Sequence, residues 1–135
     1  MSSNLKSRIP ASVHAYVRFS TDRQKDGDSI ARQRASAQAE ADKRGLKITE
    51  WISDEGKSAF KGANRKVGNL SKWLARLDDG EIAPGSILIL ESIDRLSREA
   101  VMDALDTYTR IINAGVTVIT TMDGQECNRA NLNAQ

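Results

Sequence analysis

The sequence has one cysteine, Cys127, and one histidine, His14, among its 135 residues. A single thiol has no partner for an internal disulfide, so a reducing cytoplasm is the simplest expected setting. No apolar run approaches the roughly 20 residues that a membrane-spanning helix needs. Residues 1–10 also lack the apolar core of a signal peptide. These absences predict a cytoplasmic protein that does not enter a membrane.

Several motifs of common enzyme and nucleotide-binding classes are absent as well. The chain contains no G-x-S-x-G, no G-x-x-x-x-G-K-[ST] and no G-x-G-x-x-G. His14 precedes Ser20 in an expected strand by about 20 Å, at roughly 3.3 Å per residue, and cannot act as its base. The sequence therefore argues against Ser-His-Asp acyl transfer and against the common nucleotide sites.

What the chain does contain fits one globular domain. Its residues are 39% hydrophobic and 28% charged, with a formal net charge of +2. A domain of this size buries roughly two thirds of the surface of its unfolded chain, so it needs no disulfide or metal for stability. The net charge is too small to indicate an anionic partner. Arginine outnumbers lysine, however, and arginine forms paired hydrogen bonds to oxyanions.

Segments with strand-like and helix-like patterns alternate along the chain. We expect strands at Val13–Phe19, Leu46–Ser53, Ser86–Ser92 and Val116–Thr121. We expect a helix at Ile30–Arg44 capped by Asp28 and Ser29, a second containing Leu70, Trp73, Leu74 and Leu77, and a third capped by Ser97 with Val101, Leu105, Tyr108 and Ile112 on one side. The alternation predicts a Rossmann-like three-layer α/β fold: a mainly parallel sheet of about four strands with helices on both faces.

Polar segments follow three of the expected strands. They are Ser20–Asp28, Asp54–Gly68 and Ile93–Arg98. Because sites in parallel sheets form at the carboxyl ends of the strands, these segments are expected to meet at one edge. The residues that this edge would gather are Arg18, Ser20, Arg65, Asp94, Arg95 and Arg98.

The stretch "YVRFSTDRQ" places Arg18 and Ser20 on the same face of the first strand, because side chains alternate along a strand. A turn-forming serine beside an ion-paired arginine is the ordinary interpretation of such a pair. The alternative is a serine nucleophile acting on a phosphate. Fixed guanidinium groups would stabilise the negative charge that develops on phosphoryl oxygens.

The stretch "DRLSR" places Arg95 and Arg98 at the expected entry of the third helix, where backbone N–H groups favour a bound phosphate. Asp94 is expected to hold an arginine in place or to accept a proton. A capped helix with surface ion pairs describes most segments of this kind when they are considered alone.

The segments "YVRFSTDRQ", "DEGKSAF" and "SIDRLSR", in this order, resemble the catalytic domain of serine recombinases, the resolvase and invertase family. The resemblance extends from about Val13 to Gly124. It implies that Ser20 attacks a DNA phosphodiester, forming a phosphoserine bond and a free 3′ hydroxyl, and that the strands are exchanged and rejoined. It implies neither a metal nor a nucleotide cofactor.

The same resemblance implies roles for further residues at matching positions. The expected catalytic residues are Ser20, Arg18, Asp94, Arg95, Arg98, Arg65, Gln24 and Gln33, and the expected substrate-binding loop contains Asp54 and Ser58. The segment "GANRKVGNL" lacks the proline that commonly follows the loop arginine of the family, and Ala59 and Phe60 replace the usual glycine.

For the whole protein, the resemblance implies specific DNA as the partner, read mainly by regions outside this chain. It also implies a homodimer and a tetramer, and association with the nucleoid when bound to DNA. We expect a flexible leader at 1–11, the catalytic domain at 12–125 and the start of a C-terminal continuation at 126–135. By itself the chain is expected to be inactive.

Two other functions are consistent with parts of the sequence. The first is a metal-dependent phosphoryl-transfer domain whose carboxylates would be Asp54, Glu55, Glu91 and Asp94, although no D-x-D occurs at a strand end. The second is a catalytically inactive module for assembly or phosphate binding. An inactive relative would be expected to have lost Ser20 or an arginine of the motifs, whereas all of them are present.

Overall fold

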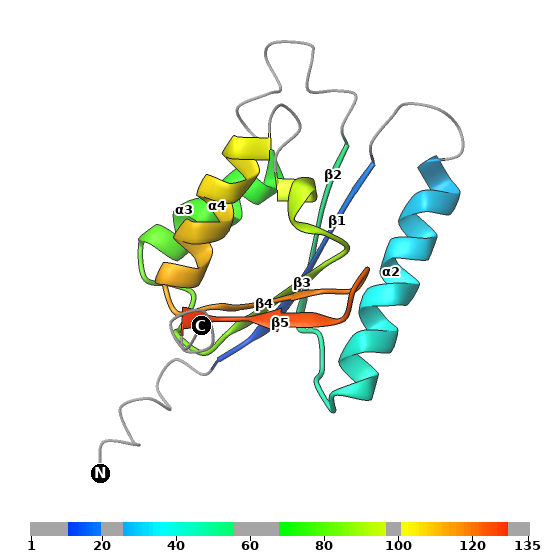
Figure 1. The fold of residues 1–135 in the computed structure, drawn as a ribbon, viewed down its shortest axis with the longest axis horizontal. Helices are drawn as coiled ribbons and strands as arrows, with labels where there is room; N and C mark the ends of the chain where they lie inside the picture. The colour runs from blue at the N-terminus through cyan, green and yellow to red at the C-terminus, as the bar shows by residue number, and fades with distance from the viewer. Residues whose placement is uncertain (1–10, 20–25, 56–67, 97–100, 130–135) are drawn as a thin grey trace.

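The computed structural model describes residues 11–19, 26–55, 68–96 and 101–129. In these ranges a five-stranded sheet has α2 (Asp26–Lys43) on one face, and α3 (Asn69–Asp78) and α4 (Val101–Asn113) on the other (Figure 1). The strands are β1 (Val13–Phe19), β2 (Glu50–Glu55), β3 (Ile87–Leu90), β4 (Thr117–Thr120) and β5 (Gln125–Cys127), and a 3-10 helix, η3 (Ile93–Leu96), follows β3. The expected three-layer α/β fold is confirmed.

The order of the strands is β2-β1-β3-β4-β5. β1 pairs in parallel with β2 and β3, and β3 pairs in parallel with β4. β5 pairs antiparallel with β4, which makes five strands where about four were expected. The carboxyl ends of β1, β2 and β3 therefore lie at one edge of the sheet, as the alternating pattern predicted.

The larger part of the core lies between the sheet and the pair α3 and α4. Trp73 and Leu77 of α3 and Ile111 of α4 are buried there against Tyr16 and Leu88 of the sheet. Burying side chains of this size contributes about 1.5–3 kcal/mol each relative to exposure. The helical spacing of apolar residues in α3 thus reflects core packing, with Trp73 among the core residues.

The opposite face of the sheet packs against α2 through small side chains. Ala37 and Ala41 of the helix are buried against Ala15, Ile89 and Ile119 of the sheet. Alternation along β1 separates the two cores, because Ala15 faces α2 whereas Tyr16 faces α3 and α4.

Two expected element starts are wrong. α2 begins at Asp26, so Asp28 and Ser29 lie inside the helix and do not precede it. Acidic residues are favourable in a first helical turn as well as at a cap, so the pattern did not separate the two. The second strand begins at Glu50, whereas Leu46 and Ile48 precede it and pack against the α2 core without pairing.

The expected buried side of the third helix is also partly wrong. α4 begins at Val101, and Leu105 is 42% exposed. The side that faces the core is instead formed by Ala104, Ile111 and Ile112, with Tyr108 partly buried beside them. These positions are spaced i, i+4, i+7 and i+8, which defines a slightly rotated helical stripe.

Arg44 joins the end of α2 to the turn before β5. Its guanidinium donates to Glu40 in the same helix (Nε···Oε2 2.8 Å), to Glu126 in β5 (2.7 Å) and to the carbonyl of Gly124 (3.2 Å). The short strand β5 is therefore held by a side chain far away in the sequence.

Within the described ranges, no helix has both the length and the apolar character needed to cross a bilayer.

Candidate catalytic edge of the sheet

The carboxyl ends of β1 and β2 bring two of the expected site residues into register. Arg18 is paired with Asp54 across the two parallel strands, and the side chain of Arg18 is buried. The neighbouring strand β3 ends at Leu90 and leads into Glu91 and η3. We define the candidate catalytic edge, called the catalytic edge below, as the described residues Arg18, Gln33, Asp54 and 91–96.

Gln33 of α2 holds the end of β1 by two hydrogen bonds to one residue. Its Oε1 accepts from the backbone N–H of Arg18 (3.1 Å), and its Nε2 donates to the carbonyl of Arg18 (3.0 Å). Gln33 is buried, where an unmade hydrogen bond would be costly. The helix thereby determines where the chain leaves β1, two residues before Ser20.

Asp54 connects β2 to the start of α3. Its carboxylate accepts from the backbone N–H groups of Asn69 (2.7 Å) and Leu70 (3.0 Å), and from the hydroxyl of Tyr16 (3.0 Å). The first N–H groups of a helix have no partner within it, and a negative charge there is favourable. Asp54 thus caps α3 from a neighbouring strand.

The sequence predicted Arg95 at the start of the third α-helix. Arg95 lies instead in η3, before α4 begins at Val101. Its Nε and Nη2 both donate to Oε1 of Glu91, at 3.2 and 2.7 Å. The other carboxylate oxygen of Glu91 accepts from Arg32 of α2 at 2.5 Å. Burial raises the pKa of Glu91, but hydrogen bonds from Arg32 and Arg95 outweigh it and hold that pKa below its usual value. Glu91 is therefore ionised at neutral pH.

Asp94 is exposed and accepts a short hydrogen bond from the hydroxyl of Ser92. The backbone N–H of Arg95 donates to the carbonyl of Ser92 at 3.1 Å. These contacts shape the turn after β3. Three of the carboxylates considered for a metal site therefore have other partners: Asp54 caps a helix, Glu91 binds two arginines and Asp94 binds a serine. The side chain of Glu55 is not among those that the structure describes.

The remaining expected site residues lie outside the described residues. They are Ser20, Gln24, Ser58, Arg65 and Arg98. The catalytic edge therefore brings together Arg18, Gln33 and Asp54 from the first half of the chain and Asp94 and Arg95 from the second. Two contacts at this edge were not predicted from the sequence: the contact of Arg32 with Glu91, and that of Glu91 with Arg95. The i, i+4 spacing of Glu91 and Arg95 was the available signal for the second.

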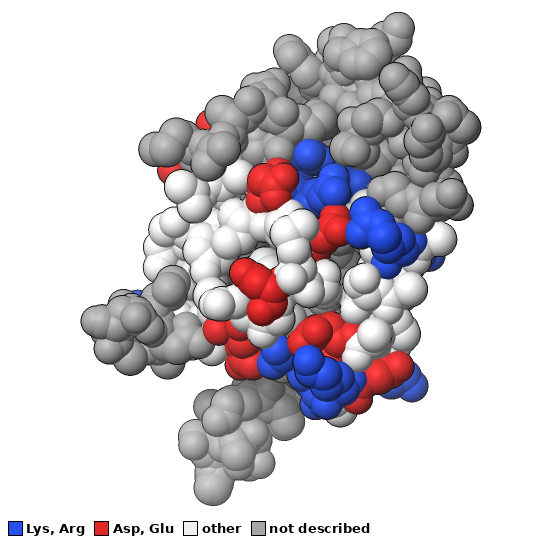
Figure 2. Space-filling view, turned by 45° about the vertical axis from the view of Figure 1, so that its right-hand side comes forward, with Lys and Arg blue, Asp and Glu red and all other residues white. Residues whose placement is uncertain are grey.

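Acidic and basic side chains are intermixed on the face drawn in Figure 2. Among the described residues, Arg32 and Arg95 pair with Glu91, and Arg44 pairs with Glu126. A modest net charge of +2 thus conceals local pairing of arginine with carboxylate.

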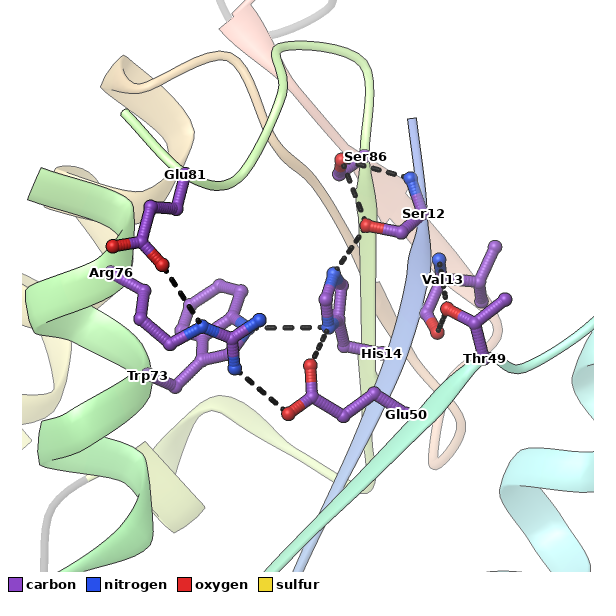
Figure 3. A network of polar contacts seen from close by, with 9 residues as sticks. All are labelled: Ser12, Val13, His14, Thr49, Glu50, Trp73, Arg76, Glu81 and Ser86. Carbon is purple, nitrogen blue, oxygen red and sulfur yellow. Dashed lines mark hydrogen bonds and ion pairs between the residues drawn. The ribbon is translucent and has the colours of Figure 1, made fainter. Parts of the chain in front are cut away.

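His14 belongs to a separate polar network near the amino end of β1 (Figure 3). Its Nδ1 is 2.9 Å from Oε1 of Glu50, and its Nε2 is 2.7 Å from the hydroxyl of Ser12. Arg76 also binds Glu50 (2.8 Å), and the indole Nε1–H of Trp73 points at the same Nδ1 of His14 from 3.3 Å, so Nδ1 faces both a carboxylate acceptor and an N–H donor. The edge of the Trp73 ring packs against the imidazole. The network lies at the amino end of β1, whereas the strand ends at Phe19.

This network predicts that acid destabilises the domain. Burial lowers the pKa of His14, an effect that its hydrogen bond to Glu50 only partly offsets, and the hydrogen bond from Arg76 lowers the pKa of Glu50. The unfolded chain therefore binds more protons than the folded one below about pH 6.5 for His14 and below about pH 4.5 for Glu50.

We expect the urea midpoint of the domain to fall as the pH is lowered from 7 to 5, with a smaller slope in His14→Gln. We attribute the loss of stability between pH 7 and 5 to protonation of His14, because Glu50 remains ionised through most of this range. Equal slopes for the two proteins would show that other groups cause the loss of stability.

Comparison with known proteins supplies the family. Residues 13–134 match the family model described as the N-terminal domain of resolvase. The chain is 38% identical over 132 residues to the uncharacterized protein YbcK of Escherichia coli (strain K12), covering 88% of this chain and 24% of that protein. The chain thus spans about a quarter of the length of this relative.

Solved structures share the fold. A resolvase-family site-specific recombinase from Streptococcus pneumoniae aligns with a TM-score of 0.68 at 20% identity, covering 93% of this chain and 83% of that one. The N-terminal catalytic domain of TP901-1 integrase aligns with a TM-score of 0.60 at 21% identity, covering 85% and 81%. The C-terminal catalytic domain of ISC1926 TnpA, an IS607-like serine recombinase, aligns with a TM-score of 0.60 at 19% identity, covering 82% and 68%.

The family model covers nearly the whole chain, and the solved structures have the same arrangement of sheet and helices. The segments "YVRFSTDRQ", "DEGKSAF" and "SIDRLSR" all lie within the matched residues. The chain therefore belongs to the family of resolvase N-terminal domains.

Proposed function

We propose that this domain breaks and rejoins DNA strands in a site-specific recombinase, with Ser20 as the nucleophile. The Oγ of Ser20 attacks the phosphorus of a DNA phosphodiester, and the bond from phosphorus to the 3′ oxygen breaks. The serine loses its hydroxyl proton, and the released 3′ oxygen gains one. The attack of that hydroxyl, in a new partner strand, on the phosphoserine reverses the step and rejoins the DNA.

One observation carries this proposal: the two halves of the motif come from adjacent parallel strands that end at the same edge. Arg18 is in β1, immediately before the serine segment, and Arg95 is in the turn after β3, which pairs with β1. Residues 18 and 95 are far apart in the sequence, and a purely structural arginine in either segment would not require this arrangement.

The basic residues have a defined task in this reaction. Attack on the phosphodiester places extra negative charge on the non-bridging oxygens, and arginine donates two hydrogen bonds in a fixed plane without losing its charge. Arg18, Arg95, Arg98 and Arg65 are proposed as these donors, and Asp94 as the group that orients an arginine or accepts a proton. Gln24, Gln33, Asp54 and Ser58 are proposed to shape the site.

The fixed position of the end of β1 supports this assignment. The buried amide of Gln33 binds both backbone polar groups of Arg18, so the segment that contains Ser20 starts from a rigid point. A nucleophile held in the correct geometry avoids a large entropic cost in the reaction. The covalent phosphoserine conserves the energy of the cleaved linkage, so the proposed reaction consumes no nucleotide.

We extend the proposal to the whole protein in the same terms. The catalytic domain would comprise residues 12–125, after a leader at 1–11, with a C-terminal continuation from 126 onward that leads to regions reading the DNA site. Two copies would bind one site, and a tetramer would hold two sites for exchange. The protein would act in the cytoplasm, on nucleoid DNA.

The proposal is tested with the full-length protein and a recombination site that carries a nick near the scissile phosphate. Cleavage then releases a short fragment, which traps the covalent intermediate. We expect a protein–DNA adduct to form in EDTA, and mass spectrometry to locate the attached nucleotide on Ser20. Adduct or cleavage that requires a divalent cation would support the metal-dependent alternative instead.

A further inference from the structure

We infer that Glu91 is a positioning residue that holds the guanidinium of Arg95 for the reaction, and that Arg32 anchors Glu91 from α2. This inference rests on the proposed function, because it assigns Arg95 to the substrate phosphate. Glu91 itself would not touch DNA. Its task would be to determine where the Arg95 donors point before DNA arrives.

The contacts of Glu91 are those of a fixed bridge. One carboxylate oxygen receives both Nε and Nη2 of Arg95, and the other receives Nη1 of Arg32. The Glu91 side chain is only 10% exposed and that of Arg95 only 17%. Exposed ion pairs contribute little, whereas the Glu91–Arg95 pair is largely enclosed and its hydrogen bonds are charge-assisted. The side chain of Arg32, which forms the outer contact, is 56% exposed.

The backbone of Glu91 is fixed as well. Its carbonyl accepts from the N–H of Met122 at 3.1 Å, and the preceding carbonyl of Leu90 accepts from Thr121 at 2.9 Å, so the chain after β3 remains tied to the chain after β4. A carboxylate that extends from a fixed backbone is able to orient a side chain in the more irregular turn that follows.

The anchor of Glu91 also joins the two halves of the catalytic edge. Arg32 and Gln33 are neighbours in α2. Gln33 binds the backbone of Arg18 in β1, and Arg32 binds Glu91 after β3. One turn of α2 therefore sets the position of the strand that leads to Ser20 and of the carboxylate that holds Arg95.

The guanidinium of Arg95 has donors on more than one side. Nε and Nη2 both donate to Glu91, so the contacts of the guanidinium with this carboxylate lie along one side. A guanidinium has five N–H donors, and the opposite side retains donors that point away from Glu91. Because the guanidinium is planar and rigid, fixing the donors on one side also fixes the direction of the donors on the other side.

The test is Glu91→Gln in the full-length protein, on the nicked DNA site. Glutamine preserves the shape of the side chain but removes the charge. We expect single-turnover adduct formation at saturating DNA to slow by about 10²-fold, the loss that a misplacement of about 1 Å can cause. DNA affinity should be unchanged or higher, because an acidic group has been removed. Glu126→Gln, which removes the carboxylate bound by Arg44 elsewhere in the structure, is the matched control and should react normally.

A double-substitution cycle tests the anchor. Arg32→Gln should slow the same step, and Arg32→Gln combined with Glu91→Gln should be no slower than Glu91→Gln alone, because both act through one contact. In ¹⁵N-labelled protein the Nε–H signal of Arg95, identified by its loss in Arg95→Lys, should be protected from water exchange and lose that protection in Glu91→Gln.

The outcomes separate this inference from the proposed function. A wild-type adduct on Ser20 together with an unchanged or faster rate in Glu91→Gln would overturn the positioning role and leave the proposed function intact. Additive losses in the double variant would show that Arg32 acts separately from Glu91. If the wild-type protein forms no adduct on Ser20, the proposed function fails and the positioning role fails with it.

Discussion

Ser20→Ala is expected to abolish the covalent protein–DNA adduct, because the methyl group of alanine has no oxygen with which to attack phosphorus. The reaction has no other nucleophile in the proposed mechanism, so the expected loss is complete and not graded. DNA binding should persist, since the arginines that attract the phosphate remain. The measurement is adduct yield on the nicked site by denaturing gel electrophoresis, with DNA affinity measured in parallel.

The matched control is Ser71→Ala, which removes an exposed serine hydroxyl from α3. It should form the adduct at the wild-type rate. Persistence of the adduct in Ser20→Ala would assign the attack to another residue. Loss of DNA binding together with loss of the adduct would instead indicate a structural role for the serine.

Arg95→Ala is expected to slow cleavage by about 10²–10³-fold, equivalent to about 2.7–4 kcal/mol of barrier, the typical cost of removing one donor to a developing oxyanion. The fold should survive this change. Glu91 retains its contact with Arg32, so the substitution does not leave a buried carboxylate without a counter-ion. The loss of stability should therefore be well below the about 3–5 kcal/mol that follows when one partner of a buried ion pair is orphaned.

Arg110→Ala provides the comparison for Arg95→Ala. Arg110 also pairs with a carboxylate, that of Asp78, but it joins the last turns of α4 and α3, away from the catalytic edge. It should cleave normally and lose little stability. The two variants are compared by single-turnover cleavage and by urea unfolding. An unfolded Arg95→Ala protein would favour a structural role for the arginine.

The local pattern of the sequence predicted most of the elements that have a strong period or a marked break. The spacing of Leu70, Trp73 and Leu77 identified α3, and the apolar run after Ser86 identified β3. The pattern predicted these elements because a helix buried on one side, or a strand buried on both faces, needs apolar residues at regular positions. The pattern located the ends of elements less accurately. At Leu46, for example, the side chain is packed but the backbone does not pair with a neighbouring strand.

β5 could not be predicted in the same way. It is three residues long, and its residues Gln125 and Glu126 are exposed, so it carries no periodic burial signal. Its existence depends on pairing with β4 and on the guanidinium of Arg44 at the end of α2. Such a strand is determined by contacts across long distances in the sequence.

The same distinction applies to the catalytic edge. The sequence by itself determined the fold class and the residue types of the two motifs, because the alternation of strands and helices dictates parallel strands whose carboxyl ends meet. Only the tertiary structure decided what each side chain binds: Asp54 caps α3, Gln33 holds the backbone of Arg18, and Glu91 lies between Arg32 and Arg95. A hydrogen bond requires atoms about 3 Å apart, and only the packing of distant segments brings them that close.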